Sequence, residues 1–427
     1  MPFFAFIKEF GKNTPKKSYF QNMKRVKIRK MFTAALLGIA GISTAWAAPL
    51  FIGYYPDWGK WHKPAYTVDK VPYDKLTHVL WSFITPNTDG TLKGDAADDP
   101  SALDSMVTLA HAVGTKVIVS LGGGGQSENF VPVASDDALR GKFIANLVQF
   151  VADHNLDGLD MDWEWEYKPP EADTIAYSKL LTELREALPK DKSLSAALPC
   201  SPYYGKWFTT EVLVKNLDWF GFMTYDMTGD WDEKALFDSP LYPHEGYTTW
   251  SWQETFDYWS KRGVPAEKMV FGIPAFGFQF EGATGPGSNF TKGKTKSLSY
   301  AQIVKNTDWE IHFDSVSVEP YAVSANSYIT YEDPHSAAIK TRWVKENGYA
   351  GIMVWEVSHD YIEGVGNPIL DSIAIVLRET PTGIEPRKGH VRSTQQLQKK
   401  QTKHVDALGK TADNAKNMKM RYRIKKP

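Results

Sequence analysis

The sequence contains almost no cysteine: Cys200 is the only one among 427 residues. A single thiol cannot form a disulfide within the chain, so packing of apolar side chains must hold the core. The chain is 42% hydrophobic and 13% aromatic, which is enough for a large core. Cys200 has little support as a catalytic thiol, because it follows a predicted strand and no histidine is near it.

The sequence also lacks an N-terminal apolar run long enough to span a bilayer comfortably. The run Met31 to Ile42 follows a basic stretch and precedes a small-x-small cleavage pattern that ends at Ala47. We predict that residues 1–47 are a signal peptide, which makes the protein secreted or periplasmic without a stable membrane anchor. An uncleaved anchor is the alternative. If Met23 is the true start, residues 1–22 are a spurious upstream extension.

Acidic residues are scarce at both ends of the chain and abundant between them. Residues 1–47 hold 9 Lys and Arg against 1 Asp or Glu, and residues 378–427 hold 14 against 4. The body, 48–377, holds 26 against 45, a net charge of −19. An acidic body argues against nucleic acid as the main ligand and fits a neutral substrate. We predict that the basic tail is disordered, although it could contact nucleic acid, anionic lipid or an acidic polymer.

Within the body, short apolar runs alternate with segments of helical periodicity. The eight apolar runs are Leu50 to Tyr55, Leu76 to Ile84, Lys116 to Leu121, Leu156 to Glu164, Ser193 to Leu198, Leu217 to Tyr225, Lys268 to Ile273 and Gly351 to Trp355. The helical segments are Ser101 to Val113, Asp136 to His154, Glu171 to Leu188, Trp252 to Arg262 and Pro334 to Asn347. This alternation predicts an α/β fold, a closed (β/α)8 TIM barrel over residues 48–377. An open doubly wound sheet is the alternative, but no glycine-rich phosphate-binding motif follows the first run.

One connection is too long for a simple loop. The segment from Gly277 to Asn326 contains strand-like and aromatic pieces. We predict a small α+β insertion after the seventh strand, at 278–327.

The most unusual stretch of the body is Asn155 to Trp165. In a β-strand, Asp160, Asp162 and Glu164 point to one face, and the apolar residues between them point to the other. Three carboxylates in a row on one face of an otherwise apolar strand repel one another and have raised pKa values, which is typical of a functional site. No histidine stands at metal-ligand spacing from these acids, so we expect neither a metal nor a cofactor.

The stretch Asp157-Gly158-x-Asp160-x-Asp162-x-Glu164 resembles the DGxDxDxE signature of glycoside hydrolase family 18, the chitinases and their relatives. The resemblance implies substrate-assisted, retaining hydrolysis of β-1,4 bonds between N-acetylglucosamine units. It assigns Glu164 as the acid and base, Asp162 as the residue that orients the acetamido group, and Asp160 as the residue that shares a proton with Asp162. Like charges below Glu164 are expected to raise its pKa. We expect a monomer that acts on chitin or its oligomers.

Other strand ends resemble further elements of the family. Met223-Thr224-Tyr225-Asp226 resembles its MxYD element, which implies that Tyr225 binds the acetamido carbonyl, with Met223 and Asp226 in the same subsite. Ser120-Leu121-Gly122-Gly123 resembles its SxGG element. There Gly122 and Gly123 would let the acidic strand approach, and Ser120 could hydrogen-bond Asp160. Asp157 lies on the other face of its strand and is expected to hold backbone near the strand's start.

Aromatic residues are predicted to shape the sugar site. In Met353-Val354-Trp355-Glu356, Trp355 ends the eighth strand, where the family has the floor of the −1 subsite. Tyr54 and Phe83 would wall the same pocket, although each could be a core residue. The chain departs from the family after Gly277, where an Arg is missing, and after Glu164, where the segment before Pro169 is longer.

Three other functions stay open from the sequence. An endo-β-N-acetylglucosaminidase acting on N-glycans or peptidoglycan would share the acidic file. A non-catalytic chitin-binding lectin could share the barrel, but such relatives have usually lost the terminal Glu, which is present here as Glu164. The basic tail could instead make this a nucleic-acid-binding or surface protein.

Overall fold

The computed structural model describes residues 48–165 and 168–379. The chain divides into two units, 1–48 and 49–427, and all but one of the described residues belong to the second unit. The predicted signal peptide lies outside the described residues, as does the predicted tail except for its first two residues. Among the described residues, no helix is both long enough and apolar enough to cross a membrane.

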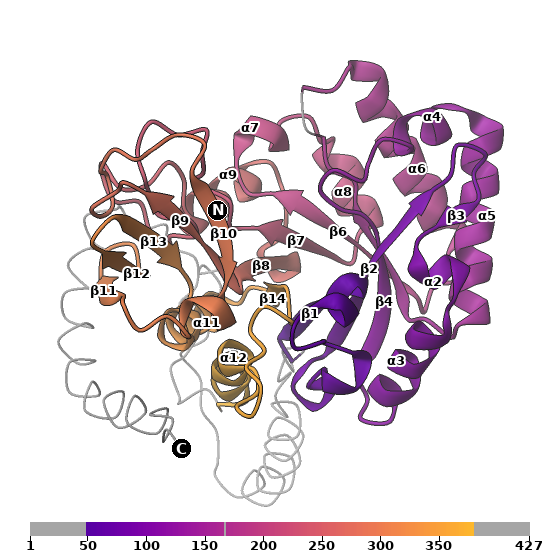
Figure 1. Cartoon of the computed structure of the whole chain (residues 1–427). Coiled ribbons are helices and arrows are strands. Elements are labelled where there is room, and N and C mark those ends of the chain that lie inside the picture. The colour runs from indigo at the N-terminus through magenta and orange to yellow at the C-terminus, as the bar shows by residue number, and fades with distance from the viewer. Residues whose placement is uncertain (1–47, 166–167, 380–427) are drawn as a thin grey trace, which may run out of the picture. The chain divides into compact units, whose positions relative to one another are not determined.

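Eight parallel strands close into a barrel (Figure 1). Each pairs with its neighbours in parallel, and β1 closes the barrel by pairing with both β14 and β2. The strands are β1 (Leu50–Pro56), β2 (His78–Pro86), β4 (Lys116–Gly122), β5 (Gly158–Asp162), β6 (Ser193–Pro199), β7 (Trp219–Met223), β8 (Met269–Pro274) and β14 (Gly351–Trp355). The predicted TIM barrel is therefore confirmed, and the open doubly wound sheet was the wrong alternative.

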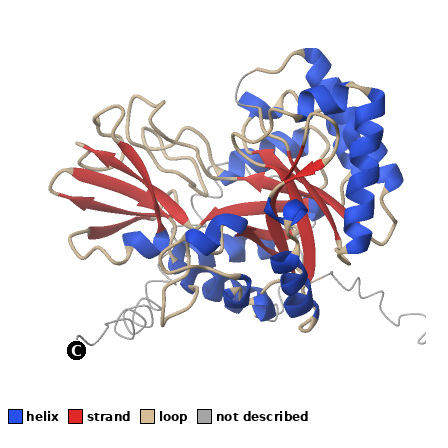
Figure 2. Cartoon of the chain, turned by 45° about the vertical axis from the view of Figure 1, so that its right-hand side comes forward, coloured by secondary structure: helices blue, strands red, loops and turns tan. Residues whose placement is uncertain are grey.

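Helices cover the outside of the barrel strands (Figure 2). The five predicted helices are present as α3 (Ser101–His111), α5 (Asp137–Asp153), α6 (Glu171–Ala187), α9 (Trp252–Lys261) and α11 (Pro334–Asn347). Two further helices, α8 (Thr210–Asn216) and α12 (Pro368–Arg378), were not predicted. Short pieces complete the connections: β3 (Leu92–Lys93), α2 (Asp95–Asp98), α4 (Phe130–Ser135), α7 (Pro202–Gly205), and the 3-10 turns η1 (Asp57–Trp61), η2 (Val68–Lys70), η3 (Tyr73–Lys75) and η4 (Ala266–Lys268).

The insertion between β8 and α11 is a five-stranded antiparallel sheet with one short helix. Its elements are β9 (Phe276–Glu281), β10 (Thr295–Ser299), α10 (Tyr300–Ile303), β11 (Glu310–Asp314), β12 (Glu319–Ser324) and β13 (Ser327–Tyr331). The sheet begins earlier and ends later than the predicted range 278–327. The reason is the pairing of β9 with β13, which joins Gly277 to Tyr331 and so draws the flanking residues into the sheet.

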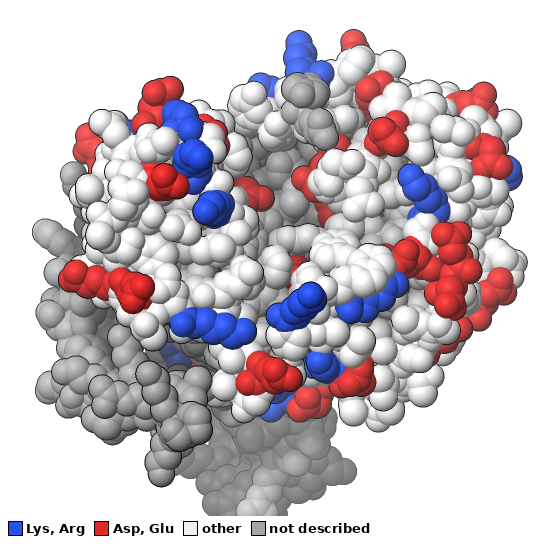
Figure 3. All heavy atoms as spheres, viewed as in Figure 1, with Lys and Arg blue, Asp and Glu red and all other residues white. Residues whose placement is uncertain are grey.

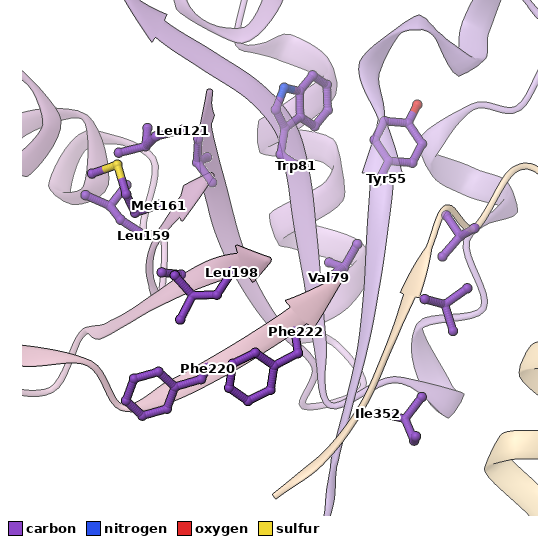
Figure 4. Packing of buried hydrophobic residues seen from close by; sticks show 14 of the residues in the cluster. Tyr55, Val79, Trp81, Leu121, Leu159, Met161, Leu198, Phe220, Phe222 and Ile352 are labelled. Carbon is purple, nitrogen blue, oxygen red and sulfur yellow. The ribbon is translucent and has the colours of Figure 1, made fainter. Parts of the chain in front are cut away.

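The core has two separate layers on the two faces of the barrel strands. Residues that face the helices form the larger cluster, which includes Leu159 and Met161 of β5 (Figure 4). A smaller cluster fills the barrel interior and contains Tyr54 and Tyr225. Because side chains alternate along a strand, the residue between Leu159 and Met161 faces the interior. That residue is Asp160, and the fold thus turns the acids of β5 inward.

Candidate active site

Asp160 lies deep in the barrel and accepts three hydroxyl hydrogen bonds. Its Oδ1 accepts from Ser195 Oγ at 2.6 Å, and its Oδ2 accepts from Ser120 Oγ at 2.8 Å and Tyr54 Oη at 3.1 Å. The strand register explains this set, because Asp160 is paired with Ser120 on β4 and with Ser195 on β6. Burial raises the pKa of Asp160, and the three donors oppose that rise.

Asp162, at the end of β5, is also buried, but its surroundings differ from those of Asp160. Its Oδ1 has no hydrogen-bond partner among the described residues. Burial raises the pKa of Asp162 well above its usual range, and the charges of Glu164 and then Asp160 add to the rise. No hydrogen bond joins Asp160 to Asp162 among those described, so their sharing of a proton stays a prediction. Asp162 offers a buried oxygen with free hydrogen-bonding capacity.

Glu164 lies two residues beyond the end of β5, where it is half-buried, and its backbone N–H donates to Ser127 Oγ at 3.1 Å. Burial raises the pKa of Glu164 to about 7, and the charge of Asp226 adds to this effect. The acids below Glu164 were expected to raise its pKa, and the repulsion between Glu164 and Asp162 is present. Burial and Asp226, which follows β7, are two causes that were not expected. A carboxyl with this pKa can hold a proton near neutrality and release it.

Two glycines at the end of β4 allow the close approach of the acidic strand. Gly122 has φ +116°, and a Cβ there would lie 2.3 Å from the carbonyl oxygen of Asp162. Gly123 donates its N–H to that same carbonyl at 2.8 Å, and a Cβ on it would lie 2.5 Å from the ring of Phe83. Any side chain at either position would therefore push β4 away from β5 or from the aromatic wall.

Tyr225 and Asp226 follow the end of β7 and reach the same region. Tyr225 is buried beside the acids, and burial together with the charge of Asp162 raises its pKa well above the usual value. Asp226 has φ +55°, a left-handed conformation that is uncommon outside glycine. Part of its side chain is exposed, yet the surrounding protein desolvates the carboxylate and raises its pKa to about 6. Met223 is half-buried and packs on the interior cluster.

Aromatic rings form one wall of the site around Trp355, which is half-buried at the end of β14. Tyr54 meets its ring edge-on at 5.5 Å between centroids, and Phe83 stacks on it at 5.7 Å. Trp58 contacts both Trp355 and Phe83, at 6.2 and 6.1 Å. Trp58 was not predicted, although its position just after the first strand was a signal that could have found it.

A cavity of about 270 Å³ continues from this aromatic wall. Its lining residues are Asp57, Trp58, Trp61, Phe83, Thr85, Lys93, Gly94, Asp95 and Gln126. On the face shown in Figure 3, acidic side chains are visible at the walls of the hollow between the barrel and the insertion. Flat rings beside polar groups suit a sugar, whose CH faces pack on rings and whose hydroxyls need hydrogen bonds.

Asp157 lies away from this site, before the start of β5. Its Oδ2 accepts from the backbone N–H of Val117 and pairs with His111 Nε2, both at 2.8 Å. These contacts tie the beginnings of two neighbouring strands together, at the opposite end of β5 from Glu164. The geometry therefore gives Asp157 contacts with backbone rather than with the acids.

Comparison with known proteins agrees with this architecture. Residues 50–360 match the model of the family described as glycosyl hydrolases family 18. The chain belongs to this family, so it is a glycoside hydrolase. An endochitinase of Manduca sexta is 27% identical over 383 residues, which cover 79% of this chain and 69% of that protein.

Solved structures share the fold. The Group IV chitinase of Ostrinia furnacalis in complex with allosamidin matches with a TM-score of 0.72 and 24% identity, covering 77% of this chain and 98% of that one. A mutant of catalytic domain 2 of the Group II chitinase of the same organism, in complex with penta-N-acetylchitooctaose, matches with a TM-score of 0.71 and 27% identity. This second match covers 78% of this chain and 97% of that one.

Proposed function

We propose that this protein is an exported chitinase that hydrolyses β-1,4 bonds between N-acetylglucosamine units. Glu164 is the acid and base, and the substrate's own acetamido group is the nucleophile. The assignment rests on the family, on the endochitinase named above, and on a related structure that holds a chitin-type oligomer. The export signal is proposed from residues 24–47 of the sequence.

In the proposed mechanism, Glu164 gives its proton to the glycosidic oxygen as that bond breaks. The acetamido oxygen attacks the anomeric carbon of its own sugar and forms an oxazolinium ion. Water then opens the ion, with Glu164 taking a proton from that water and so returning to its starting state. The hydroxyl of Tyr225 donates a hydrogen bond to the acetamido oxygen, and the rings around Trp355 pack against the sugar.

The observation that carries this proposal is the unpartnered Oδ1 of Asp162. A buried oxygen without a partner costs free energy unless a ligand supplies a donor. The acetamido N–H is such a donor, and its acidity increases as the oxazolinium ion forms. Asp162 then accepts this hydrogen bond while the proton it shares with Asp160 stays on the Asp160 side. A sugar without an N-acetyl group would leave Asp162 unsatisfied.

Product analysis on chitin hexamer tests the proposal, with detection of the anomer that is released first. Participation of the acetamido group requires a β product, and a fully deacetylated hexamer of the same length should stay intact. An α product, or equal cleavage of both hexamers, would overturn the mechanism and favour a scheme in which Asp226 acts as the second carboxylate. Cleavage of an N-glycoprotein but not of chitin would identify an endo-β-N-acetylglucosaminidase, and binding without cleavage would identify a lectin.

A further inference from the structure

A second group of buried ionisable side chains lies where the insertion meets the barrel. Lys340 of α11, Glu319 of β12 and Glu332, just after β13, are all fully buried. Lys340 Nζ donates to Glu319 Oε2 at 3.1 Å and also to Glu332 Oε1. Buried charges are costly, so a cation shared by two carboxylates is a feature that needs an explanation. We call these three residues the junction cluster.

The junction cluster holds both the backbone N–H and the backbone oxygen of one residue, Ser239, in the loop after β7. Lys340 Nζ donates to the backbone oxygen of Ser239, and the backbone N–H of Ser239 donates to Glu319 Oε1 at 3.3 Å. The same Glu319 oxygen accepts from Thr330 Oγ1 at 3.0 Å, and Thr330 Oγ1 in turn accepts from the backbone N–H of Asp238 at 3.0 Å. Asp238 and Ser239 are therefore fixed by charged and hydroxyl groups that come from the insertion and from α11.

These two residues in turn hold the segment Thr224 to Met227 from both ends. At the first end, Ser239 Oγ donates to the backbone oxygen of Thr224 at 2.6 Å. At the other end, the backbone N–H of Met227 donates to the backbone oxygen of Asp238 at 3.1 Å. Between these contacts lie Tyr225 and Asp226.

The backbone at Asp226 is in the left-handed region, with φ +55°, which costs free energy for a non-glycine residue. Such a conformation persists when the surrounding structure over-determines it. Contacts on both sides of this residue supply that constraint. The junction cluster is thus connected through two hydrogen-bond paths to the residue that adds to the raised pKa of Glu164.

We propose that Lys340 is a positioning residue for the reaction, which acts through Ser239 and Asp238 to hold Tyr225 and Asp226 in place. The inference rests on the proposed function, since it assumes that Tyr225 acts on the acetamido group. In this view the insertion is more than a wall of the substrate cleft, because its buried carboxylates set the geometry of a strand end on the other side of the junction. Neither Lys340 nor Ser239 belongs to the sugar site itself.

The test compares Lys340→Met and Ser239→Ala with the unmodified protein on chitin hexamer. Turnover is expressed per folded molecule, with the folded fraction measured by circular dichroism at the assay temperature. For Lys340→Met we expect kcat to fall about ten- to a hundredfold while KM stays within about twofold, since a small displacement of a positioned group is enough for such a loss. Ser239→Ala should show a smaller fall of kcat, because Trp252 Nε1 also donates to the Thr224 oxygen, at 3.1 Å.

Arg140→Met is the matched control. Arg140 is another buried cation with several partners, including Glu183 and the backbone oxygen of Ala134, but it joins α5 to α6 on the outside of the barrel. We expect this variant to lose stability and to keep its kcat per folded molecule. If kcat per folded molecule stays within twofold for Lys340→Met and Ser239→Ala, the proposal is overturned; if Lys340→Met does not fold, Ser239→Ala decides alone. Retained activity of Glu164→Gln in the same assay would instead overturn the proposed function.

Discussion

Two regions of this protein bury carboxyl groups, and they balance the charge differently. At the junction with the insertion, the ammonium group of Lys340 lies between Glu319 and Glu332. In the barrel, no Lys or Arg of the described residues forms an ion pair with Asp160, Asp162 or Glu164. Three hydroxyl groups donate to Asp160, and burial raises the pKa values of all three acids.

The comparison indicates which buried acids can act as acids. Burial raises the pKa of Glu319, and the neighbouring Lys340 opposes the rise because its charge favours the ionised carboxylate. Glu164 has no such cation, and its pKa of about 7 leaves it ready to give and take a proton. In these two regions, the carboxylate beside a fixed cation is the one expected to serve structure, and Glu164 is the one expected to serve chemistry.

The largest expected effect is that of Glu164→Gln. The amide keeps the shape of the side chain but cannot donate a proton to the leaving oxygen, so kcat on chitin hexamer should fall about 10²- to 10⁴-fold. Binding of the hexamer, measured by calorimetry, should persist. Glu128→Gln is the control. Glu128 is exposed on the loop after β4, so its substitution should leave kcat unchanged. Full activity of Glu164→Gln would show that this acid has no catalytic role.

Loss of the Lys340 cation from the junction cluster should lower the stability of the protein. Lys340→Met leaves two buried carboxylates without their cation, and we expect the free energy of unfolding to fall by about 3–5 kcal/mol. Adding Glu319→Gln removes one of those charges and should restore part of the loss. Denaturant unfolding of the two single variants and the double variant measures the coupling. Simple additivity of the two substitutions would contradict a direct charge interaction.

Asp226→Asn should shift the pH dependence of kcat/KM, because it changes the pKa of Glu164. The negative charge of Asp226 adds to the raised pKa of Glu164, so its removal lowers that pKa from about 7. Because Glu164 must be protonated to act as an acid, kcat/KM should begin to fall at a lower pH, by up to about one unit. The pH profile of kcat/KM on chitin hexamer measures this shift. A shift of the alkaline limb to higher pH would mean that Asp226 does not act on Glu164 as a like charge.

The smallest effect is expected from Ser195→Ala, which removes one of three donors to Asp160. A buried carboxylate that loses one hydrogen bond should cost about 1–3 kcal/mol in the free energy of unfolding. Ser193→Ala is the control, because Ser193 lies two residues earlier on β6 and is half-buried at the start of the strand. Denaturant unfolding measures the free energy of unfolding of both variants. Equal losses of this free energy would show that the hydrogen bond from Ser195 to Asp160 does not add to stability.

Much of the fold was predictable because it depends on local patterns. Alternating apolar runs and helical periodicity predicted eight strands and five of the barrel's helices, and all are present. The short helix α8 was missed because its seven residues carry too little periodicity. The helix α12 was missed although six of its eleven residues are buried, since no comparable segment follows it to complete the alternation.

For the candidate site, the sequence predicted the acids but not all of their surroundings. The contact of Ser120 with Asp160 was predicted from the resemblance, and the two atoms are 2.8 Å apart. Ser195 was not predicted, because nothing local marks a serine on β6 as a partner of a residue on another strand. Trp58 was not predicted either, although it lies just after the first strand. The contribution of Asp226 to the raised pKa of Glu164 was also not predicted, because Asp226 is distant in sequence.

By itself the sequence determined the family, the barrel and the order of acids along β5, because side-chain alternation within a strand is a property of the chain's local geometry. Only the tertiary structure decided which groups meet those acids. Strand register places Ser120 and Ser195 beside Asp160, and the folding of the insertion onto α11 places Lys340 between two carboxylates. Such contacts depend on how distant segments pair, and no local pattern specifies that pairing.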